Sequence, residues 1–412
     1  MQNHVLLVSC LLFRSTHADN GGMTSEFHAS TREAVEAYSD RVTQAVLGFA
    51  ETASIVLGDG LGWYAELAAA GEAGRTASDL ALATDTQSRY AQEWLEQQTM
   101  AGLVEVVASA PSGAGARRFR LPAGAAEVLV HRGTTTALLP MVRMLRAGVA
   151  GMPELLEAYK HGGGVTWDQV GDEARQAQAE GNRPWFLEQL PQALASVESL
   201  HSVLSRPGAR ITDVACGFGW STLALARAYP QSQVTGIDID EPSIVAERGN
   251  ADARGPSANV EFYVADGADP VTAHSQDAVF IFEALHDMPF PVQVLSAART
   301  MVKPDGAVVV MDEAVAATFD PEAGSPDEKL LERLMYAYSL FLCLPDSMAT
   351  PGSAATGTVM RPAVLERYAI QAGFAAVEQL PIGDFSVFRF YRLTLPDREG
   401  DTTPRLAAAR RP

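Results

Sequence analysis

Hydrophobic and polar positions divide this chain of 412 residues into a helical first part and an alternating second part. From Arg32 to about Val130, apolar residues recur at spacings of three and four, which is the period of an amphipathic helix. From Arg210 onward, short apolar runs typical of strands alternate with amphipathic stretches. Such alternation requires crossover connections, so we expect an α/β fold with a doubly wound, mostly parallel sheet. Its strands are expected at residues 211–215, 234–239, 260–264, 278–282 and 307–311.

The first part has the pattern of a helix-turn-helix followed by a hairpin. Thr76 is the expected N-cap of one short helix, and Asp85 or Thr86 is the expected N-cap of the next, which runs to about Ala101. The two hairpin strands and their turn are expected at residues 103–108, 118–121 and 111–116. This order predicts a mainly α, winged-helix-like domain over residues 32–130.

Prolines and composition set the remaining boundaries. Helices that follow the first domain are expected to break around Pro140 and Pro153, because proline lacks an amide hydrogen. The apolar stretch at residues 5–13 is too short to span a bilayer, and no basic residue precedes it as a secretory signal requires. The expected division is a disordered extension at 1–31, a helical linker and cap at 131–205, an α/β domain at 206–395 and a disordered tail at 396–412.

Charge and cysteine content limit the classes of partner. The formal net charge of -19 opposes nonspecific binding to phosphate backbones and to anionic lipids, so neither nucleic acid nor membrane is an expected partner. The three cysteines are widely separated and lack metal-ligand spacing, so neither a disulfide framework nor a zinc site is predicted. These features suit the reducing cytoplasm, where we expect the protein to act.

A glycine-containing segment at residues 213–230 predicts a strand, a tight turn and the start of a helix. Gly217 and Gly219 allow the backbone to approach a ligand closely, and the helix N-terminus behind them supplies free amides. Asp238 ends the next strand, where a carboxylate can accept hydrogen bonds from two ribose hydroxyls. The alternatives are an ordinary strand-to-helix turn and a solvated acid at a strand end. The combination favours a nucleotide-type site.

The later strands also lead into polar residues. Asp266 and Gly267 follow the third strand, where the acid can meet an adenine edge, and Glu283 follows the fourth strand. The segment 303–313 supplies the turn and strand after the next helix.

Together, residues 210–313 resemble the class I S-adenosylmethionine-dependent methyltransferases, whose fold is Rossmann-like. The resemblance implies S-adenosylmethionine as the cofactor. It implies that Asp213 orients the glycine loop and faces the methionine amine, while Asp238 holds the ribose and Asp266 the adenine. Ala215 stands where the family usually has the first glycine of the loop, and a methyl group is tolerated there. The implied cofactor-binding residues are Asp213, Ala215, Gly217, Gly219, Asp238, Ile239, Asp266, Gly267 and Glu283.

Nearly the whole chain, from about Arg41 to Leu393, is similar to bacterial methyltransferases with an N-terminal winged-helix domain, best known from actinobacteria. These proteins are distantly similar to plant-type O-methyltransferases. The segments that carry the similarity are GDGLGWYAELAAAG, SRYAQEWLEQQTMAGLV, ALHDMPFP and YSLFLCLPDSM. The resemblance implies a catalytic domain at 206–395 and a first domain that forms a homodimer interface and covers the active site.

Members of that family are often labelled transcriptional regulators, but the charges disfavour DNA binding. The expected recognition helix carries Arg89 against Glu93 and Glu96, a net charge of -1, whereas a DNA-reading helix needs basic and amide groups. The local basic cluster is the wing, with Arg117, Arg118 and Arg120. A solvated hairpin explains such a cluster more often than a phosphate clamp does. The alternative to an enzyme is a cofactor-sensing regulator that has lost catalysis.

Methyl transfer requires alignment of the acceptor and, where the acceptor is protonated, a base. His286 is the first candidate, because histidine titrates near neutrality and plant-type O-methyltransferases use a similar His-Asp pair. The alternative is that His286 fixes the loop and helix, with Asp287 as its orienter or as a helix-capping acid. Glu283 can contact the methionine portion of the cofactor or the acceptor, or be an ordinary carboxylate at a strand end.

The strongly apolar segment 334–348 is expected to line the acceptor pocket through Tyr336, Tyr338 and Phe341, with plain core packing as the alternative. We therefore expect a small aromatic or hydrophobic acceptor, in secondary metabolism. The sequence leaves open whether oxygen, nitrogen or carbon is methylated. No metal site is predicted from His274, His286 and Asp287.

Overall fold

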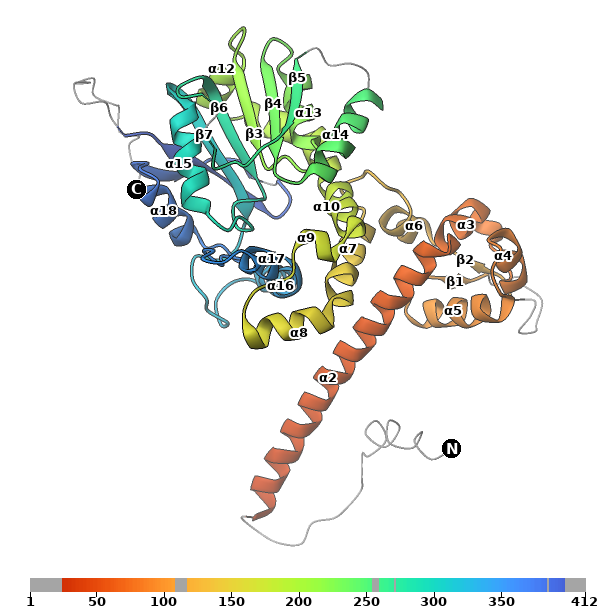
Figure 1. The fold of residues 1–412 in the computed structure, drawn as a ribbon. Coiled ribbons are helices and arrows are strands. Elements are labelled where there is room, and N and C mark those ends of the chain that lie inside the picture. Colours follow the sequence, from red (N-terminus) through yellow and green to blue (C-terminus); the bar gives the residue numbers. More distant parts are fainter. Residues whose placement is uncertain (1–23, 108–116, 254–258, 270–271, 384, 397–412) are drawn as a thin grey trace. The chain divides into compact units, whose positions relative to one another are not determined.

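The computed structural model describes residues 24–107, 117–253, 259–269, 272–383 and 385–396 (Figure 1). The chain divides into two compact units, residues 1–130 and 131–412, which are described separately below. The division coincides with the predicted end of the first domain at residue 130. The predicted turn at 111–116 lies outside the described residues, as do residues 1–23 and 397–412 of the predicted extension and tail.

The first unit contains the predicted helix pair followed by two short strands. Its elements are α2 (Thr24–Gly60), α3 (Trp63–Ala70), a 3-10 turn (Gly71–Ala73), α4 (Ala77–Ala83), α5 (Ser88–Met100), β1 (Glu105–Val106), β2 (Phe119–Arg120) and α6 (Ala123–Leu129). The two strands pair antiparallel, as a hairpin requires, with Val106 opposite Phe119. The buried aromatic residues Trp63, Tyr64 and Trp94 form the centre of this unit's core.

The start of α4 follows the prediction, whereas the start of α5 does not. The Thr76 hydroxyl accepts a hydrogen bond from the Asp79 amide at 3.1 Å, and the Asp79 carboxylate accepts one from the Thr76 amide at 3.3 Å, which is a capping box. The expectation that Asp85 or Thr86 caps α5 is wrong, because this helix begins two residues after Thr86. The Thr86 hydroxyl instead accepts a hydrogen bond from the Trp63 indole at 3.1 Å, and Asp85 has a φ of 50° in the intervening turn.

Each arginine of the wing faces a carboxylate. Arg117 lies 3.5 Å from Glu96, Arg118 lies 3.3 Å from Asp79, and Arg120 lies 2.8 Å from Glu105. The guanidinium of Arg118 also donates hydrogen bonds to the backbone carbonyls of Ala73 and Gly74. The positive charges of the wing are therefore largely neutralised within the first unit.

Helix α2 begins at Thr24, so the predicted boundary at residue 31 falls inside a helix. Its large apolar side chains are mostly exposed. Val35, Tyr38, Val42, Val46 and Phe49 are between 58% and 74% exposed. Within the described ranges no single helix is long and apolar enough to cross a membrane, although one bent pair, 31–60 with 63–73, passes by length and composition.

The second unit is built on a seven-stranded sheet of the predicted kind. The strands are β3 (Arg210–Val214), β4 (Gln233–Asp238), β5 (Val260–Val264), β6 (Gln276–Phe282), β7 (Val302–Glu313), β8 (Ala376–Gln379) and β9 (Phe388–Thr394). Their order is β5-β4-β3-β6-β7-β9-β8, and the first five are parallel. Strand β9 pairs antiparallel with both β7 and β8. Strands β8 and β9 are not among the strands predicted from the sequence.

Helices precede the sheet and then alternate with its strands. Those before the sheet are α7 (Leu139–Ala150), α8 (Met152–His161), α9 (Trp167–Val170), α10 (Asp172–Pro184), a π-helical turn (Trp185–Gln189), α11 (Leu190–Ala195) and α12 (Glu198–Leu204). The others are α13 (Trp220–Ala228), α14 (Glu241–Ala253), α15 (Pro291–Met301), α16 (Pro326–Tyr338), a π-helical turn (Ser339–Cys343), α17 (Leu344–Ala349) and α18 (Pro362–Gln371). As expected, Pro140 and Pro153 mark helix boundaries, in the first turns of α7 and α8.

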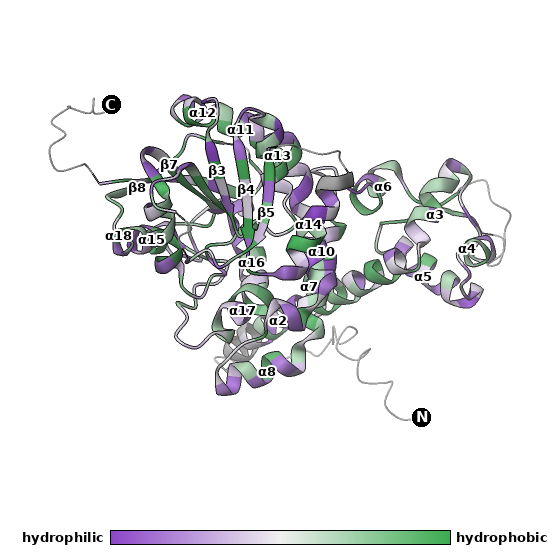
Figure 2. Cartoon of the chain, turned by 45° about the horizontal axis from the view of Figure 1, so that its top comes forward, coloured by the Kyte–Doolittle hydropathy of each residue, from purple (hydrophilic) through white to green (hydrophobic). Residues whose placement is uncertain are grey.

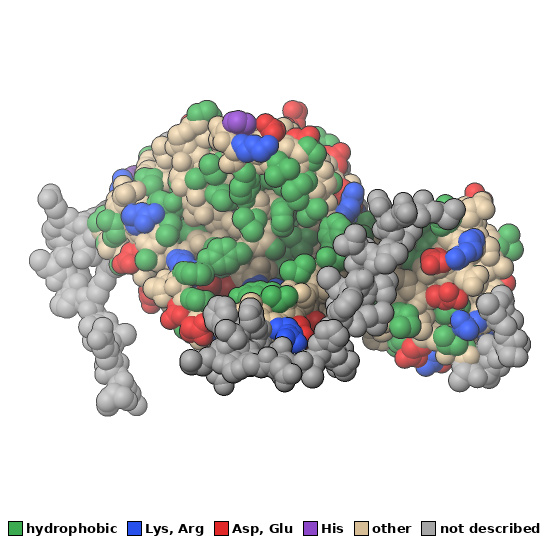
Figure 3. Space-filling model, turned by 90° about the horizontal axis from the view of Figure 1, so that it is seen from below, with side chains coloured by type: hydrophobic (Ala, Val, Ile, Leu, Met, Phe, Trp, Pro, Cys, Tyr) green, Lys and Arg blue, Asp and Glu red, His purple; other side chains and the backbone are tan. Residues whose placement is uncertain are grey.

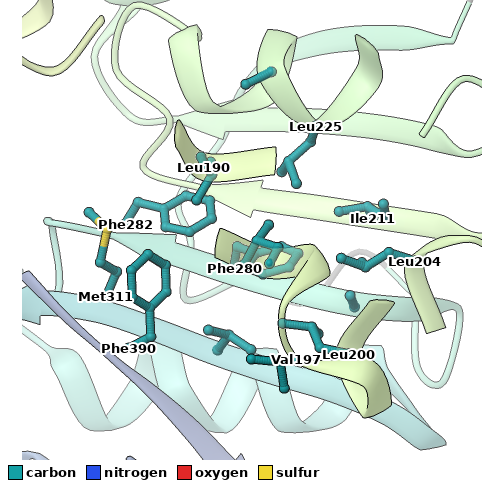
Figure 4. Packing of buried hydrophobic residues seen from close by; sticks show 14 of the residues in the cluster. Leu190, Val197, Leu200, Leu204, Ile211, Leu225, Phe280, Phe282, Met311 and Phe390 are labelled. Atoms are coloured by element: carbon teal, nitrogen blue, oxygen red, sulfur yellow. The ribbon is translucent and has the colours of Figure 1, made fainter. Parts of the chain in front are cut away.

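The sheet is buried on both faces because alternate residues of its strands point to opposite sides. On one face Phe280, Phe282 and Met311 pack against α11, α12 and α13 (Figure 4). On the other face Ile281 and Val310 pack against α15 and α18. This packing fixes the positions of the carboxyl ends of the strands, where the candidate site lies.

Phe280 provides a test of this core. It is fully buried and stacks on Phe282 with ring centroids 5.0 Å apart. Phe280→Ala should lower the free energy of unfolding by about 3–5 kcal/mol, because it removes a large apolar side chain and leaves a cavity. The control is Leu330→Ala on α16, where the side chain is 61% exposed. Urea denaturation followed by circular dichroism measures both, and equal losses would contradict this account of the core.

Candidate active site

The loop between β3 and α13 brings backbone amides to the end of the sheet. Ala215, Gly217 and Gly219 all have positive φ, at 58°, 55° and 73°. This conformation costs an alanine about 1–2 kcal/mol, so Ala215 is a strained residue of the kind that clusters at functional sites. A side chain is disfavoured at Gly219, because its φ is left-handed and a Cβ there would press against the buried Glu247 side chain. The loop is thus suited to close approach by a ligand.

Asp238, at the end of β4, holds this loop. One carboxylate oxygen accepts a hydrogen bond from the Gly217 amide at 2.8 Å, and the other accepts one from the Asp240 amide at 2.8 Å. Burial raises the pKa of Asp238, while the backbone hydrogen bonds oppose the rise. The Ile239 amide also donates to this carboxylate, whose remaining acceptor site can take a ribose hydroxyl.

A cavity of about 430 Å³ lies above the loop. Four of the predicted cofactor-binding residues line it: Ala215, Gly217, Asp238 and Ile239. The structure adds Arg175 of α10, whose guanidinium donates a hydrogen bond to Asp240 at 3.0 Å and ties the helix to the end of β4.

Other predicted cofactor residues lie elsewhere. Asp213 is fully buried beneath the loop, where its carboxylate accepts hydrogen bonds from the Ser221 and Thr222 hydroxyls, each at 2.6 Å. The structure thus supports its orienting role, but the side chain does not line the cavity and cannot face a methionine amine there. Burial raises the pKa of Asp213 to about 6.

The residues after β5 are also set apart from this cavity. Asp266 is exposed and accepts a hydrogen bond from the Ala268 amide at 2.8 Å, and it does not line the cavity. Gly267 packs closely on Val214, since a Cβ there would lie 2.7 Å from the valine side chain. Their role at the adenine therefore stays a prediction.

A second cavity, of about 420 Å³, adjoins the first. Its walls are largely apolar and come from α7, α16 and the two π-helical turns, including Met141, Met144, Trp185, Leu334, Tyr338 and Leu342. Its polar groups include Gln178, Asn182, Glu283, His286 and Glu313. Trp167, Gln178 and Asp287 line both cavities, so these three residues mark the place where the cavities meet.

Two of the three predicted pocket residues do not line this second cavity. Tyr338 lines it, but Tyr336 is 36% exposed and accepts a hydrogen bond from Arg361 at 3.3 Å. Phe341 lies in a separate apolar groove with residues of α8. Figure 3 shows hydrophobic side chains gathered on the face that is seen from below. The prediction for Tyr336 and Phe341 is wrong because other positions line the cavity: Leu334, Met335 and Tyr338 of α16, and Leu342 and Cys343 of the π-helical turn that follows it.

His286 is surrounded by acids. Its Nδ1 lies 3.0 Å from Asp312 and 3.2 Å from Glu313, while its Nε2 lies 3.2 Å from Asp287. Burial alone lowers the pKa of His286, but the neighbouring carboxylates raise it well above its usual value. An imidazolium held in this way has no lone pair for an acceptor's proton. The geometry therefore favours the alternative in which His286 fixes the loop.

Metal-ligating atoms also converge here. The ligand atoms of His286, Asp287 and Cys343 lie within 4.8 Å of one another, as do those of His286, Asp312 and Glu313. In the structure His286 and the three acids of these groups also form the ion pairs described above.

Helix α10 is the element that the sequence reasoning missed. Arg175, Gln178 and Asn182 lie three and four residues apart and face the two cavities, although the helix is largely hydrophilic (Figure 2) and resembles a solvent-facing one. The helical spacing of these three residues was the available signal. A polar helix face alone, however, does not show whether the face lines a ligand site or is exposed to solvent.

The strand order of the sheet matches the fold of solved S-adenosylmethionine-dependent methyltransferases. Residues 205–339 match a family model described as a methyltransferase domain. The chain therefore carries a methyltransferase domain, and the cofactor of that family is S-adenosylmethionine.

Curated relatives match over shorter stretches. The chain is 33% identical over 106 residues to the O-methyltransferase cnsE of Penicillium expansum, covering 26% of this chain and 38% of that protein. It is 32% identical over 103 residues to the ubiquinone biosynthesis O-methyltransferase of Aeromonas salmonicida, covering 25% and 42%. The chain thus spans about two-fifths of the length of these relatives.

Solved structures match over most of the chain. The mitomycin 7-O-methyltransferase MmcR has a TM-score of 0.68 at 18% identity, covering 89% of this chain and all of that one. Human N-acetylserotonin methyltransferase, solved with S-adenosylmethionine, has a TM-score of 0.64 at 15% identity, covering 88% and 98%. NcsB1 of neocarzinostatin biosynthesis has a TM-score of 0.56 at 20% identity, covering 84% and 96%. At these identities the matches establish the fold.

Glu247 makes the stability of the folded chain depend on pH. It is buried beneath the glycine loop, and burial raises its pKa to about 9 from a usual value of 4.5. Between pH 4.5 and about 9 the folded state therefore keeps a proton that the unfolded state releases. As a result, the free energy of unfolding decreases as pH rises through this range. The limiting slope is about 1.4 kcal/mol per pH unit.

Glu247→Gln should remove this contribution and make stability decline less steeply as pH rises from 5 to 9. The control is Glu241→Gln, at the exposed start of the same helix. Urea denaturation at several pH values measures both slopes, and a Glu247→Gln slope equal to that of the wild type would contradict the assignment.

Proposed function

We propose that this protein transfers a methyl group from S-adenosylmethionine to a small, aromatic or hydrophobic metabolite. The observation that carries the proposal is the junction of the two cavities. One cavity has the glycine loop and the ribose-type acid Asp238, the other has largely apolar walls, and Trp167, Gln178 and Asp287 belong to both. A methyl donor and an acceptor bound side by side would have their reacting atoms at this place.

The names of similar proteins support an acceptor from secondary metabolism. MmcR is a mitomycin 7-O-methyltransferase, and NcsB1 of neocarzinostatin biosynthesis was solved with 2-hydroxy-5-methyl naphthoic acid. An aromatic ring of that kind matches a cavity lined by Trp185, Tyr338 and several methionine and leucine side chains. We therefore favour an aromatic acceptor methylated on oxygen.

The described residues fit the cofactor. The loop at Ala215, Gly217 and Gly219 leaves room for close approach, Asp238 would accept a ribose hydroxyl, and Asp287 places negative charge where the cavities meet. When bound, S-adenosylmethionine supplies an activated methyl group on a positively charged sulfur. The protein's own residues align the acceptor, exclude water and hold that charge.

Asp238→Ala tests the cofactor site. Loss of an acid that holds the glycine loop and can accept a ribose hydroxyl should weaken S-adenosylmethionine binding roughly 10- to 100-fold. Transfer of labelled methyl groups from the cofactor into a metabolite extract should fall in parallel. Isothermal titration calorimetry measures the affinity, with Asp320→Ala at an exposed acid as the control. Unchanged affinity in Asp238→Ala would remove the basis of the site assignment.

The first unit fits a role in assembly better than one in DNA recognition. Its wing arginines are paired with acids, which disfavours the regulator hypothesis. The exposed apolar residues of α2 instead fit a contact with a second copy of this chain. We therefore infer a cytoplasmic homodimeric enzyme that has no nucleic acid partner, and whose winged-helix-like domain serves in dimerisation and as an active-site cover.

Val42→Asp tests the dimer. Tyr38, Val42 and Val46 lie four residues apart on one face of α2, so a charge at the centre of this stripe should be buried unpaired in a dimer interface. Sedimentation velocity should show a dimer for the wild type and mainly monomer for the variant. Leu82→Asp, at an exposed position of α4, should leave the dimer intact. A monomeric wild type would refute this part of the proposal.

A further inference from the structure

Glu283 is held in a strained and specific position at the end of β6. Its φ of 50° is uncommon for a residue other than glycine, and its amide donates a hydrogen bond to the Met311 carbonyl of β7 at 2.8 Å. Its side chain lines the acceptor cavity and does not line the cofactor cavity. The sequence-based assignment of Glu283 to the cofactor is therefore not supported, and the acceptor remains as its partner.

Two amides of α10 bind the Glu283 carboxylate. The Asn182 side chain donates a hydrogen bond to one carboxylate oxygen, and Gln178 also donates to the carboxylate. Gln178 lines both cavities, so Glu283 lies one hydrogen bond away from the place where they meet. The carboxylate is thus both fixed in direction and close to the predicted position of methyl transfer.

The neighbouring acids and the histidine are less suited to take a proton. His286 has carboxylates beside both ring nitrogens, and Asp287 is itself one of those carboxylates. Glu313 lies 3.2 Å from His286 Nδ1 and is therefore already engaged with the imidazolium, although burial raises its pKa. Glu283 differs because its hydrogen-bond partners are neutral amides.

The charge of Glu283 is set by groups on every element around it. Burial raises its pKa to about 7, while the His286 imidazolium and the amides of Gln178 and Asn182 lower it and Asp312 raises it. Glu313 of β7 and the Tyr338 phenol of α16 are the other titratable groups that it influences. A carboxyl group that titrates near neutrality suits general base catalysis.

Resting on the methyl transfer proposed above, we propose that Glu283 is the base that accepts the proton of an aromatic hydroxyl group on the acceptor. Gln178 and Asn182 are the positioning residues that aim it. In the balanced step, the oxygen–methyl bond forms as the sulfur–methyl bond breaks, and the sulfur keeps the electron pair of that bond. The hydroxyl proton passes to the Glu283 carboxylate and leaves to solvent after the product departs. The acceptor class is thus a phenol or naphthol.

Glu283→Gln is the central experiment, with phenol, catechol and 2-naphthol as acceptors and labelled S-adenosylmethionine as donor. In the wild type, kcat should fall as pH decreases through about 7, because protonated Glu283 cannot take the hydroxyl proton. The variant should lose about 100- to 10,000-fold in kcat and should lack this acidic limb. Its affinity for S-adenosylmethionine should equal that of the wild type. Glu366→Gln, at an exposed position of α18, is the matched control.

A readout without turnover identifies the titrating group directly. Infrared difference spectra of the protein between pH 5 and pH 9 should show a protonated carboxyl band that forms near pH 7 in the wild type and is missing in Glu283→Gln. Asn182→Ala removes a hydrogen bond to the charged form, so this band and the acidic limb of kcat should both move to higher pH. A merely structural role for Asn182 would leave both midpoints in place.

The outcomes separate this inference from the function on which it rests. A wild type that binds no S-adenosylmethionine overturns the proposed function itself. A wild type that binds the cofactor and methylates none of the three phenols overturns the acceptor class. A Glu283→Gln variant that keeps its acidic limb and most of its kcat overturns the role of Glu283, and loss of the limb in Asp287→Asn alone would transfer that role to Asp287.

Discussion

The organising constraint in this molecule is the gathering of acids at the carboxyl edge of a buried parallel sheet. Parallel strands end at a common edge, and here β3, β4, β6 and β7 bring Asp213, Asp238, Glu283 and Glu313 to it. Charged carboxylates in a low-dielectric interior repel one another and lose hydration. The surrounding structure must therefore satisfy each acid in its own way.

The four acids are satisfied by four different kinds of partner. Asp213 receives two hydroxyl groups of α13, and Asp238 receives backbone amides of its own loop and the glycine loop. Glu283 receives the side-chain amides of α10, and Glu313 lies against the His286 imidazolium. Because the partners differ, the acids at this edge differ in their properties. Asp213 is fixed beneath the loop, Asp238 lines the cofactor cavity, and the pKa of Glu283 is about 7. One strand-end pattern thus yields several chemical roles.

Much of this could be predicted from the sequence, because the signals are local. The glycine turn, the acid at the end of β4 and the capping box at Thr76 each depend on residues within a few positions of one another. The predictions that failed concern contacts that are set by tertiary structure. Which side of α16 faces the cavity depends on how α16 packs against α7, so apolar content alone did not separate Tyr338 from Tyr336. Asn182 meets Glu283 across 101 positions of sequence, and no local pattern reports such a contact.

The position of α10 explains why binding and chemistry would be linked in this fold. Arg175 at one end contacts Asp240 beside the cofactor cavity, and Asn182 at the other end contacts Glu283 in the acceptor cavity. A helix is stiff over two turns, so a displacement at one end moves the other. Cofactor contacts near Asp240 and the direction of the Glu283 carboxylate are therefore set by one rigid element. The backbone strain at Ala215, after β3, and at Glu283, after β6, is tolerated because strand hydrogen bonds hold the chain there: the Cys216 amide donates to the Ile237 carbonyl, and the Glu283 amide donates to the Met311 carbonyl.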